Sequence, residues 1–343
     1  MADRRGLRGV GVALTVAVTI ASLAWVLTGI EWSRAAQALG SFRAGVLLPI
    51  AVLLTLQFGL RALRFRSLLR QAVPRGVLLS AVGVGFLAVN VVPMRLGEFV
   101  RPYLLDRYAS VPFGTGLAAT VLERVLDVLA LLALLLLATH MAELPPGALE
   151  VGGVDVITTA QRSLGVLLVV VSVGVVASLV IGERAVNAVR DGVAAFSPSV
   201  AQRVERLGLT FVSGFRTVVS ARRQGLVAVA CTVGIWGITA VCLWWMMVGF
   251  AELAPTVDRV LLNFAGTATA VATIPTPGFF GAYELGSTAA LALTGVDRSV
   301  AGTFGVAMHL VLFTHVVVTG VLCLIAQGWS LVSAVRGSRS ADG

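Results

Sequence analysis

The sequence predicts an all-α polytopic membrane protein of about six full spans and two re-entrant helical hairpins, in one transmembrane domain over residues 1–343. Apolar stretches long enough to cross a bilayer recur along the whole chain. The composition agrees, since 57% of the residues are hydrophobic, 13% are charged and the mean hydropathy is +0.94. Two stretches interrupt this pattern with charged side chains beside proline and glycine. A bilayer tolerates them only where protein or a water-filled cavity shields them.

The predicted spans follow from apolar length, and their orientation follows from the placement of arginine. The six predicted spans are residues 9–29, 44–60, 116–139, 163–181, 225–250 and 300–326. The first apolar run is too long for a typical signal peptide and lacks a small-residue cleavage site, so we interpret it as a span. The arginines from Arg61 to Arg75, which follow the second span, indicate the cytoplasmic side.

Three further segments complete the predicted topology. Residues 77–107 and 259–294 are predicted to be re-entrant broken helices, which enter from the cytoplasm and from the outside, respectively. Residues 183–224 alternate arginine with apolar residues and are predicted to form cytoplasmic amphipathic helices interrupted at Ser197 and Pro198. The predicted location is the inner or plasma membrane, and with this topology both termini lie in the cytoplasm. Two broken helices that enter the membrane from opposite faces are also typical of an inverted repeat, although no internal duplication is visible in the sequence.

The net charge of +9 comes from arginine alone, because the chain contains no lysine. In a membrane protein this excess reflects the positive-inside rule, so we do not expect nucleic acid as a partner. Cys231, Cys242 and Cys323 lie in apolar stretches without metal-ligand spacing and are predicted to be packing residues. No Walker lysine motif, zinc motif or nucleophile elbow is recognisable, so the sequence predicts no metal, no cofactor and no catalytic residue.

The first broken segment carries a dense motif made of Asn90, Pro93, Arg95, Gly97, Glu98 and Arg101. Pro93 removes a backbone donor and Gly97 permits unusual dihedral angles, so the helix should break between them. Backbone amides freed at the next helix, together with Arg95 and Arg101, would bind an anion such as a phosphate. Glu98 would orient an arginine or meet a cationic headgroup. The alternative is a cytoplasmic loop whose arginines reach toward anionic lipid.

A second charged group, Glu123, Arg124 and Asp127, lies near the start of the apolar stretch at residues 116–139. Glu123 and Asp127 share one helix face at a spacing of four, and Arg124 can reach Asp127 at a spacing of three. Because isolated charges in a membrane are costly, we expect these residues to have partners. The interpretation favoured here is an ion pair with Arg95 or Arg101, and the alternative is direct contact with a bound substrate.

The second broken segment contains four residues that cannot sustain a regular helix, Pro275, Pro277, Gly278 and Gly281, followed by Glu284. Glu284 is expected at the start of a half-helix, where it would cap the turn, bind a cationic lipid group or relay a proton. His309 and His315 lie on different faces of the last predicted span. Each is interpreted as a packed or hydrogen-bonded core residue, with proton transfer as the alternative.

These motifs together resemble the flippase-like family built around the lysylphosphatidylglycerol synthase transmembrane region, over about residues 9–326. One difference is Phe279, where that family commonly has a second small residue. In bifunctional relatives a cytosolic domain transfers an amino acid from tRNA to phosphatidylglycerol, and the membrane part moves the product outward. Because this chain ends soon after its last predicted span, the resemblance implies the transport part without the synthase part.

The function we expect is that of a lipid flippase or scramblase without enzymatic activity, acting on an anionic phospholipid or a lipid-linked saccharide. The residues expected to contact the lipid are Asn90, Arg95, Glu98, Arg101, Glu123, Arg124, Asp127 and Glu284. Two alternatives stay open: an accessory subunit of a lipid-modifying system, and a membrane enzyme that uses the carboxylates as acid and base. A synthase or glycosyltransferase partner and self-association are both compatible with the sequence.

Overall fold

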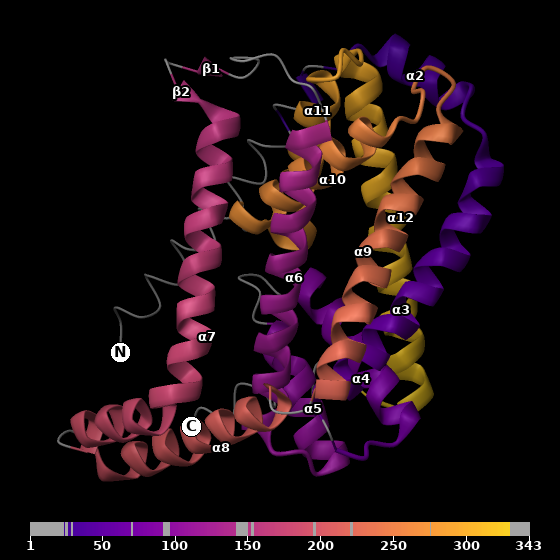
Figure 1. Ribbon diagram of the computed structural model, residues 1–343. Helices are drawn as coiled ribbons and strands as arrows, with labels where there is room; N and C mark the ends of the chain where they lie inside the picture. The colour runs from indigo at the N-terminus through magenta and orange to yellow at the C-terminus, as the bar shows by residue number, and fades with distance from the viewer. Residues whose placement is uncertain are drawn as a thin grey trace, which may run out of the picture.

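The computed structural model describes residues 24, 27–28, 30–69, 71–91, 97–141, 150–151, 154–194, 197–219, 222–274 and 276–329. Most of the predicted first span, residues 9–29, lies outside these ranges. The described chain is a bundle of helices (Figure 1), which confirms the predicted all-α class. The one addition is a two-residue antiparallel pair, β1 (Glu150–Val151) and β2 (Val154–Asp155).

The helical elements follow one another with short connections. They are α2 (Trp32–Gly40), η1 (Ala44–Val46), α3 (Leu47–Leu69), α4 (Arg75–Val91), α5 (Val100–Ala109), α6 (Phe113–Met141), α7 (Val156–Ala194), α8 (Pro198–Val219), α9 (Arg222–Gly249), α10 (Val257–Thr273), η3 (Pro277–Phe279), α11 (Ala282–Ala292) and α12 (Arg298–Gln327). The last helix shows how local chemistry sets such limits. The Asp297 side chain accepts hydrogen bonds from two backbone amides at the start of α12, and Gly328 ends it with a φ of 64°.

Three of the described helical segments are long and apolar enough to cross a membrane: Ala44–Leu69, Arg222–Gly249 and Arg298–Gln327. They coincide with the predicted spans at 44–60, 225–250 and 300–326. Helices α6 and α7 cover the other two predicted spans, 116–139 and 163–181, whose crossing of the bilayer stays a prediction.

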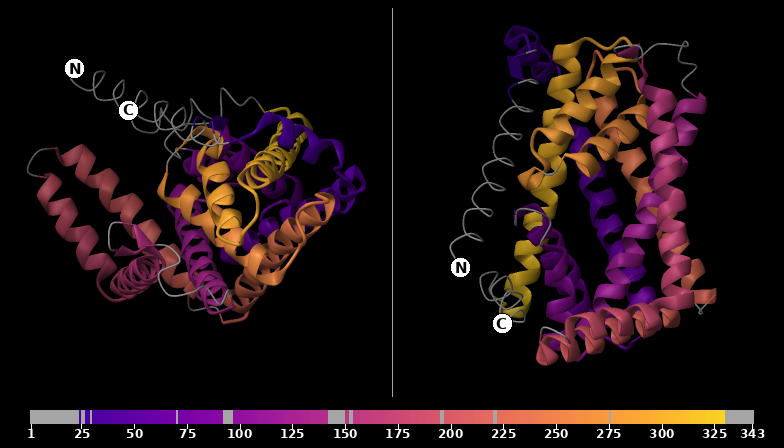
Figure 2. Two further views of the ribbon diagram at one scale, coloured as in Figure 1. Left: turned by 90° about the horizontal axis from the view of Figure 1, so that it is seen from above. Right: turned by 90° about the vertical axis from the view of Figure 1, so that its left-hand side faces the viewer.

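Helix α7 is longer than the predicted span because it continues to Ala194. Its last part lies antiparallel to α8, as Gly182 faces Val212, Gly208 faces Val186, and Arg190 pairs with Glu205 at 2.8 Å. Helix α8 and this last part of α7 project sideways from one end of the bundle (Figure 2). The helix break before Pro198 coincides with the interruption predicted there.

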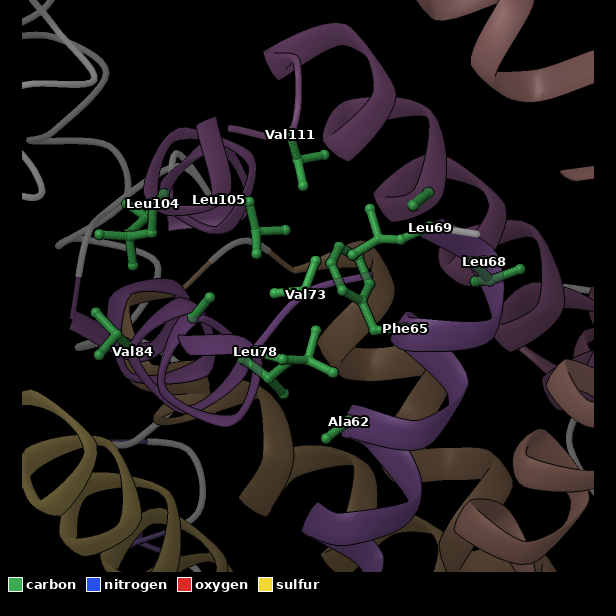
Figure 3. Close-up of a cluster of buried hydrophobic side chains, with 14 of the residues drawn as sticks. Ala62, Phe65, Leu68, Leu69, Val73, Leu78, Val84, Leu104, Leu105 and Val111 are labelled. Carbon is green, nitrogen blue, oxygen red and sulfur yellow. The ribbon is translucent and has the colours of Figure 1, made fainter. Parts of the chain in front are cut away.

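Two apolar clusters hold the bundle together. One joins the end of α3 to α4, α5 and the start of α6, with Phe65, Val84 and Leu105 fully buried (Figure 3). The other joins the opposite parts of α3 and α9 to α10, α11 and α12, around Met247 and Phe304. The charged residues described below lie beside the first cluster.

The first broken segment consists of α4 and α5, with residues 92–96 outside the described part of the chain. Gly97 brings the returning chain into contact with α4, because a Cβ atom at this position would lie 2.3 Å from Ala88 C and Val89 N. A side chain would therefore collide with backbone, which explains the need for glycine.

The second broken segment consists of α10, η3 and α11, and it lies toward the opposite end of the bundle from α4 and α5 (Figure 1). Gly278 and Gly281 have φ angles of 59° and 83°, which glycine adopts without strain. Phe279 also has a positive φ, 63°. This conformation is unfavourable for a bulky residue, and Phe279 stands where the family that the sequence resembles commonly has a small one.

Replacing Gly97 by alanine should destabilise the fold by more than about 2 kcal/mol, because the new methyl group meets α4 backbone that cannot move aside. Thermal unfolding of the purified variant in detergent measures this loss.

The matched control is Gly237→Ala in α9, where nothing lies within 4 Å of the added Cβ. It should leave stability unchanged or raise it by about 0.5–1 kcal/mol. Equal melting temperatures for the two variants would contradict the close contact at Gly97.

Candidate functional site

A buried ion-pair network begins at Arg64 of α3, whose side chain is 0% exposed. Its Nε donates to Glu123 Oε1 at 3.2 Å, and its two terminal nitrogens donate to the Asp127 carboxylate at 2.7 and 3.3 Å. One terminal nitrogen also donates to Thr232 Oγ1 of α9 at 3.1 Å. One guanidinium thus joins α3, α6 and α9, with a two-point contact to Asp127.

Arg101 of α5 extends the network from the other side. Its terminal nitrogen donates to the second carboxylate oxygen of Glu123, so Glu123 lies between two guanidiniums. The Arg101 guanidinium also packs over the rings of Phe65 and Phe86, 4.6 and 4.9 Å from their centroids. The predicted ion pair between Arg101 and the charged group on α6 is confirmed.

The outer part of the network is formed by Arg124, which pairs with Asp127 at 3.3 Å and with Glu98 at 3.8 Å. The Arg124–Asp127 pair is the spacing-of-three contact expected from the sequence. Arg124 and Glu98 are partly exposed, whereas Glu123 is fully buried. The network therefore runs from a dry interior to a more accessible edge.

A cavity of about 310 Å³ adjoins this network and is bordered by both broken segments. Asn90 and Glu98 line it from the first segment, and Phe279 and Tyr283 line it from the second. The arginine and carboxylate side chains in its wall are Arg61, Glu98, Arg101 and Arg124, and aromatic and aliphatic residues form most of the rest. Asn90 Nδ2 is held by a hydrogen bond to Phe86 O at 2.9 Å.

The network and cavity wall carry an excess of positive charge. The guanidiniums of Arg61, Arg64, Arg101 and Arg124 face the carboxylates of Glu98, Glu123 and Asp127, which is four cations against three anions. Within the described ranges no carboxylate pairs with Arg61, and its guanidinium lies 4.6 Å from the centroid of Phe86. Arg61 is therefore the cation of this group that is placed to meet an anion in the cavity.

Sequence reasoning missed Arg61 and Arg64, which were interpreted only as part of a cytoplasmic arginine cluster. Their signal is nonetheless present, since Gln57, Arg61 and Arg64 recur at intervals of four and three along one face of α3. Gln57 also lines the cavity and is held by Ile235 O and Thr239 Oγ1 of α9, at 2.9 and 2.7 Å.

The second broken segment is held by Glu284 and His309. Glu284 Oε2 accepts a hydrogen bond from Gly281 N at 2.7 Å, which closes the turn before α11. Its other oxygen, Oε1, lies 2.7 Å from His309 Nδ1. His309 is thus hydrogen-bonded and buried, as expected, and both oxygens of Glu284 are engaged within the protein. Contact of Glu284 with a lipid stays a prediction.

Three of the residues singled out in the sequence, Pro93, Arg95 and Pro275, lie outside the described ranges. Four of the predicted turn residues lie where the helices are interrupted. Gly97 lies between α4 and α5, and Pro277, Gly278 and Gly281 lie between α10 and α11. Among the residues whose placement is described, no group of three or more His, Cys, Asp or Glu side chains is arranged to hold a metal ion.

Comparison with known proteins agrees with a membrane assignment. Residues 12–320 match the protein family described as lysylphosphatidylglycerol synthase TM region. The protein named glycosyltransferase AglD, from Haloferax volcanii, is 28% identical over 364 residues. That alignment covers 96% of this chain but only 57% of AglD, so this chain spans little more than half of the length of that relative. No solved structure gives a significant match.

Replacing Glu123 by glutamine should destabilise the protein by about 3–5 kcal/mol, because the buried Arg101 would lose its carboxylate partner and Arg64 would keep only Asp127. Chemical or thermal unfolding of the reconstituted protein measures the change.

Glu98→Gln serves as the control, since it removes the same charge from a longer, partly exposed pair with Arg124. Its cost should stay within about 1 kcal/mol. A Glu123→Gln variant as stable as the Glu98→Gln variant would show that the buried network contributes no more than a surface pair.

Proposed function

Because the chain belongs to the family of lysylphosphatidylglycerol synthase transmembrane regions, we propose that it is a membrane protein that moves a phosphate-bearing lipid across the bilayer. The observation that supports this most directly is the position of Arg61. Its guanidinium borders a cavity between the two broken segments and, among the described residues, has no carboxylate partner.

The chemistry of a lipid phosphate fits this cation. Guanidinium binds phosphate through two parallel hydrogen bonds, and the interaction is stronger where water is largely excluded. The neighbouring cations Arg101 and Arg124 are already neutralised by Glu123, Asp127 and Glu98. Their Nε atoms are buried without a hydrogen-bond partner in the described part of the chain, which leaves donors beside Arg61. The site therefore favours a single negative group over a neutral one.

The size of the cavity supports binding of a headgroup rather than of a whole lipid. Its volume of about 310 Å³ is at the lower end of the range for small-molecule sites. Aromatic residues such as Phe58, Phe264 and Phe313 also line it. In our proposal the phosphate and headgroup occupy the cavity while the acyl or prenyl chains stay among the bilayer lipids.

The topology we propose places the two broken segments as re-entrant hairpins from opposite faces, within a protein of about six spans. The position of α4–α5 and α10–α11 toward opposite ends of the bundle supports this arrangement (Figure 1). Helix α8 and the last part of α7, which carry several arginines, lie at the same end as α5, which would be the cytoplasmic end by the positive-inside rule. Both termini would then be cytoplasmic.

A second candidate function is delivery of a lipid-linked substrate to a transferase. The observation that favours it is the match to a protein named as a glycosyltransferase, of which this chain aligns to 57%. Co-purification with a glycosyltransferase or synthase, combined with no lipid movement in vesicles, would support this function over transport. Product formation by the purified chain and lipid alone would instead support a membrane enzyme.

The central test replaces Arg61 by glutamine in proteoliposomes that contain NBD-labelled phosphatidylglycerol, with dithionite quenching to follow the exposed leaflet. Loss of one charge-assisted phosphate contact should slow translocation roughly tenfold or more. NBD-labelled lipids with neutral headgroups and no phosphate should be moved more slowly by the wild type and equally by both proteins.

The matched control is Arg66→Gln on the same helix, since Arg66 is exposed and does not line the cavity. Its translocation rate should equal that of the wild type. A correctly folded Arg61→Gln variant with an unchanged rate would remove Arg61 from the proposed phosphate site.

A further inference from the structure

The imidazole of His309 lies between two oxygen acceptors at the second broken segment. Its Nδ1 is 2.7 Å from Glu284 Oε1, and its Nε2 is 3.0 Å from the carbonyl oxygen of Gly278. Both partners belong to the segment of η3 and α11, whereas His309 lies on α12. The side chains of His309 and Glu284 are 5% and 2% exposed, so water does not replace either contact.

A neutral imidazole donates from only one of its two nitrogens. A carboxylate oxygen and a carbonyl oxygen both require a donor, so both contacts are hydrogen bonds only when the ring carries a proton on each nitrogen. With Glu284 ionised, the arrangement corresponds to an imidazolium beside a carboxylate. This pair is neutral as a whole, which is the less costly way to bury either group.

The surroundings hold the ring in this orientation. The ring of Tyr283 stacks on it with centroids 4.8 Å apart, and that of Phe280 packs against it at 4.6 Å. The Glu284 carboxylate is in turn fixed by Gly281 N and by the start of α11. The imidazole also lines the cavity, so a proton can leave it toward water there.

Few other titratable groups face this pair within the described chain. Tyr283 lies beside it on α11, Cys242 on α9 is near Tyr283, and His315 follows on α12. Arg61 on α3 is the cation that shares the cavity. Of these, His315 is held by Thr55 at 3.4 Å and has no contact with a carboxylate among the described residues. Of the two histidines whose side chains the structure describes, His309 is the one with both a carboxylate and a backbone carbonyl as partners.

We propose that His309 and Glu284 bind one proton and that its release opens the turn at Gly278. When the proton on Nε2 passes to water in the cavity, the nitrogen lone pair faces the lone pairs of the Gly278 carbonyl oxygen. That hydrogen bond is lost and replaced by repulsion. The turn that it held contains Gly278 and Phe279 with positive φ angles, and Phe279 forms part of the cavity wall.

Proton binding would therefore change the shape of the cavity, and a proton gradient would supply the energy for lipid movement. This coupling rests on the proposed transport function, whereas the proton site itself does not. The proton site and its coupling to lipid movement are therefore tested by two different measurements.

The proton site is tested by nuclear magnetic resonance of the wild-type protein with ¹⁵N-labelled histidine. The chain contains three histidines, and His309→Gln and His315→Gln variants assign the signals. We expect two protonated nitrogens on the His309 ring at neutral pH, and the loss of one of them in Glu284→Gln. A single N–H on the wild-type His309 ring overturns the proton site, and this result is read from the wild-type protein once the signals are assigned.

The coupling is tested in proteoliposomes with NBD-labelled phosphatidylglycerol, with and without an imposed pH difference. The wild type should move lipid several-fold faster under one direction of the gradient. His309→Gln should move it at the same rate in both conditions, because glutamine cannot bind and release the proton. His315→Gln should keep the gradient dependence of the wild type, whatever its absolute rate.

The outcomes separate the two claims. Wild-type movement that ignores the gradient overturns the coupling and leaves the proposed transport function in place. No movement of any lipid by the wild type overturns the transport function and the coupling together. A gradient response that persists in His309→Gln assigns the coupling to another group.

Discussion

The burial of Arg64 is the constraint on which the rest of the arrangement depends. A guanidinium with no exposure inside an apolar helix bundle is tolerated only if it is neutralised and its donors are hydrogen-bonded. Glu123, Asp127 and Thr232 meet this demand from α6 and α9. Because these partners come from separate helices, one side chain sets the positions of α3, α6 and α9 relative to one another.

The two broken segments border the cavity because each is fastened to a rigid helix by a different kind of contact. The first is held by the backbone approach of Gly97 to α4 and by the pairing of Arg101 with Glu123. The second is held by Glu284 and His309, which tie its turn to α12. One wall is thus fixed by a network of strong ion pairs, and the other by a single pair that can lose a proton. This difference makes the second segment the better candidate for movement.

The charges of the site explain why an anion is its expected occupant. The ion-pair network and the wall of the cavity hold four guanidiniums and three carboxylates among the described residues, so this part of the bundle is one anion short of balance. Uncompensated charge in a poorly hydrated place is costly. A phosphate at Arg61 would remove that cost, and a lipid can bring one without leaving the bilayer.

The sequence alone determined the membrane class, three helices that are long and apolar enough to cross a bilayer, the two interruptions of the helices and the need of Glu123 and Asp127 for cationic partners. These properties are local, because apolar length, proline, glycine and isolated charge act within a few residues. Only the tertiary structure decided which arginines pair with these two carboxylates. Arg64 lies 59 residues from Glu123 in the chain and looks like any cytoplasmic arginine until α3 packs against α6. Pairing at that separation depends on how helices cross, which no local pattern specifies.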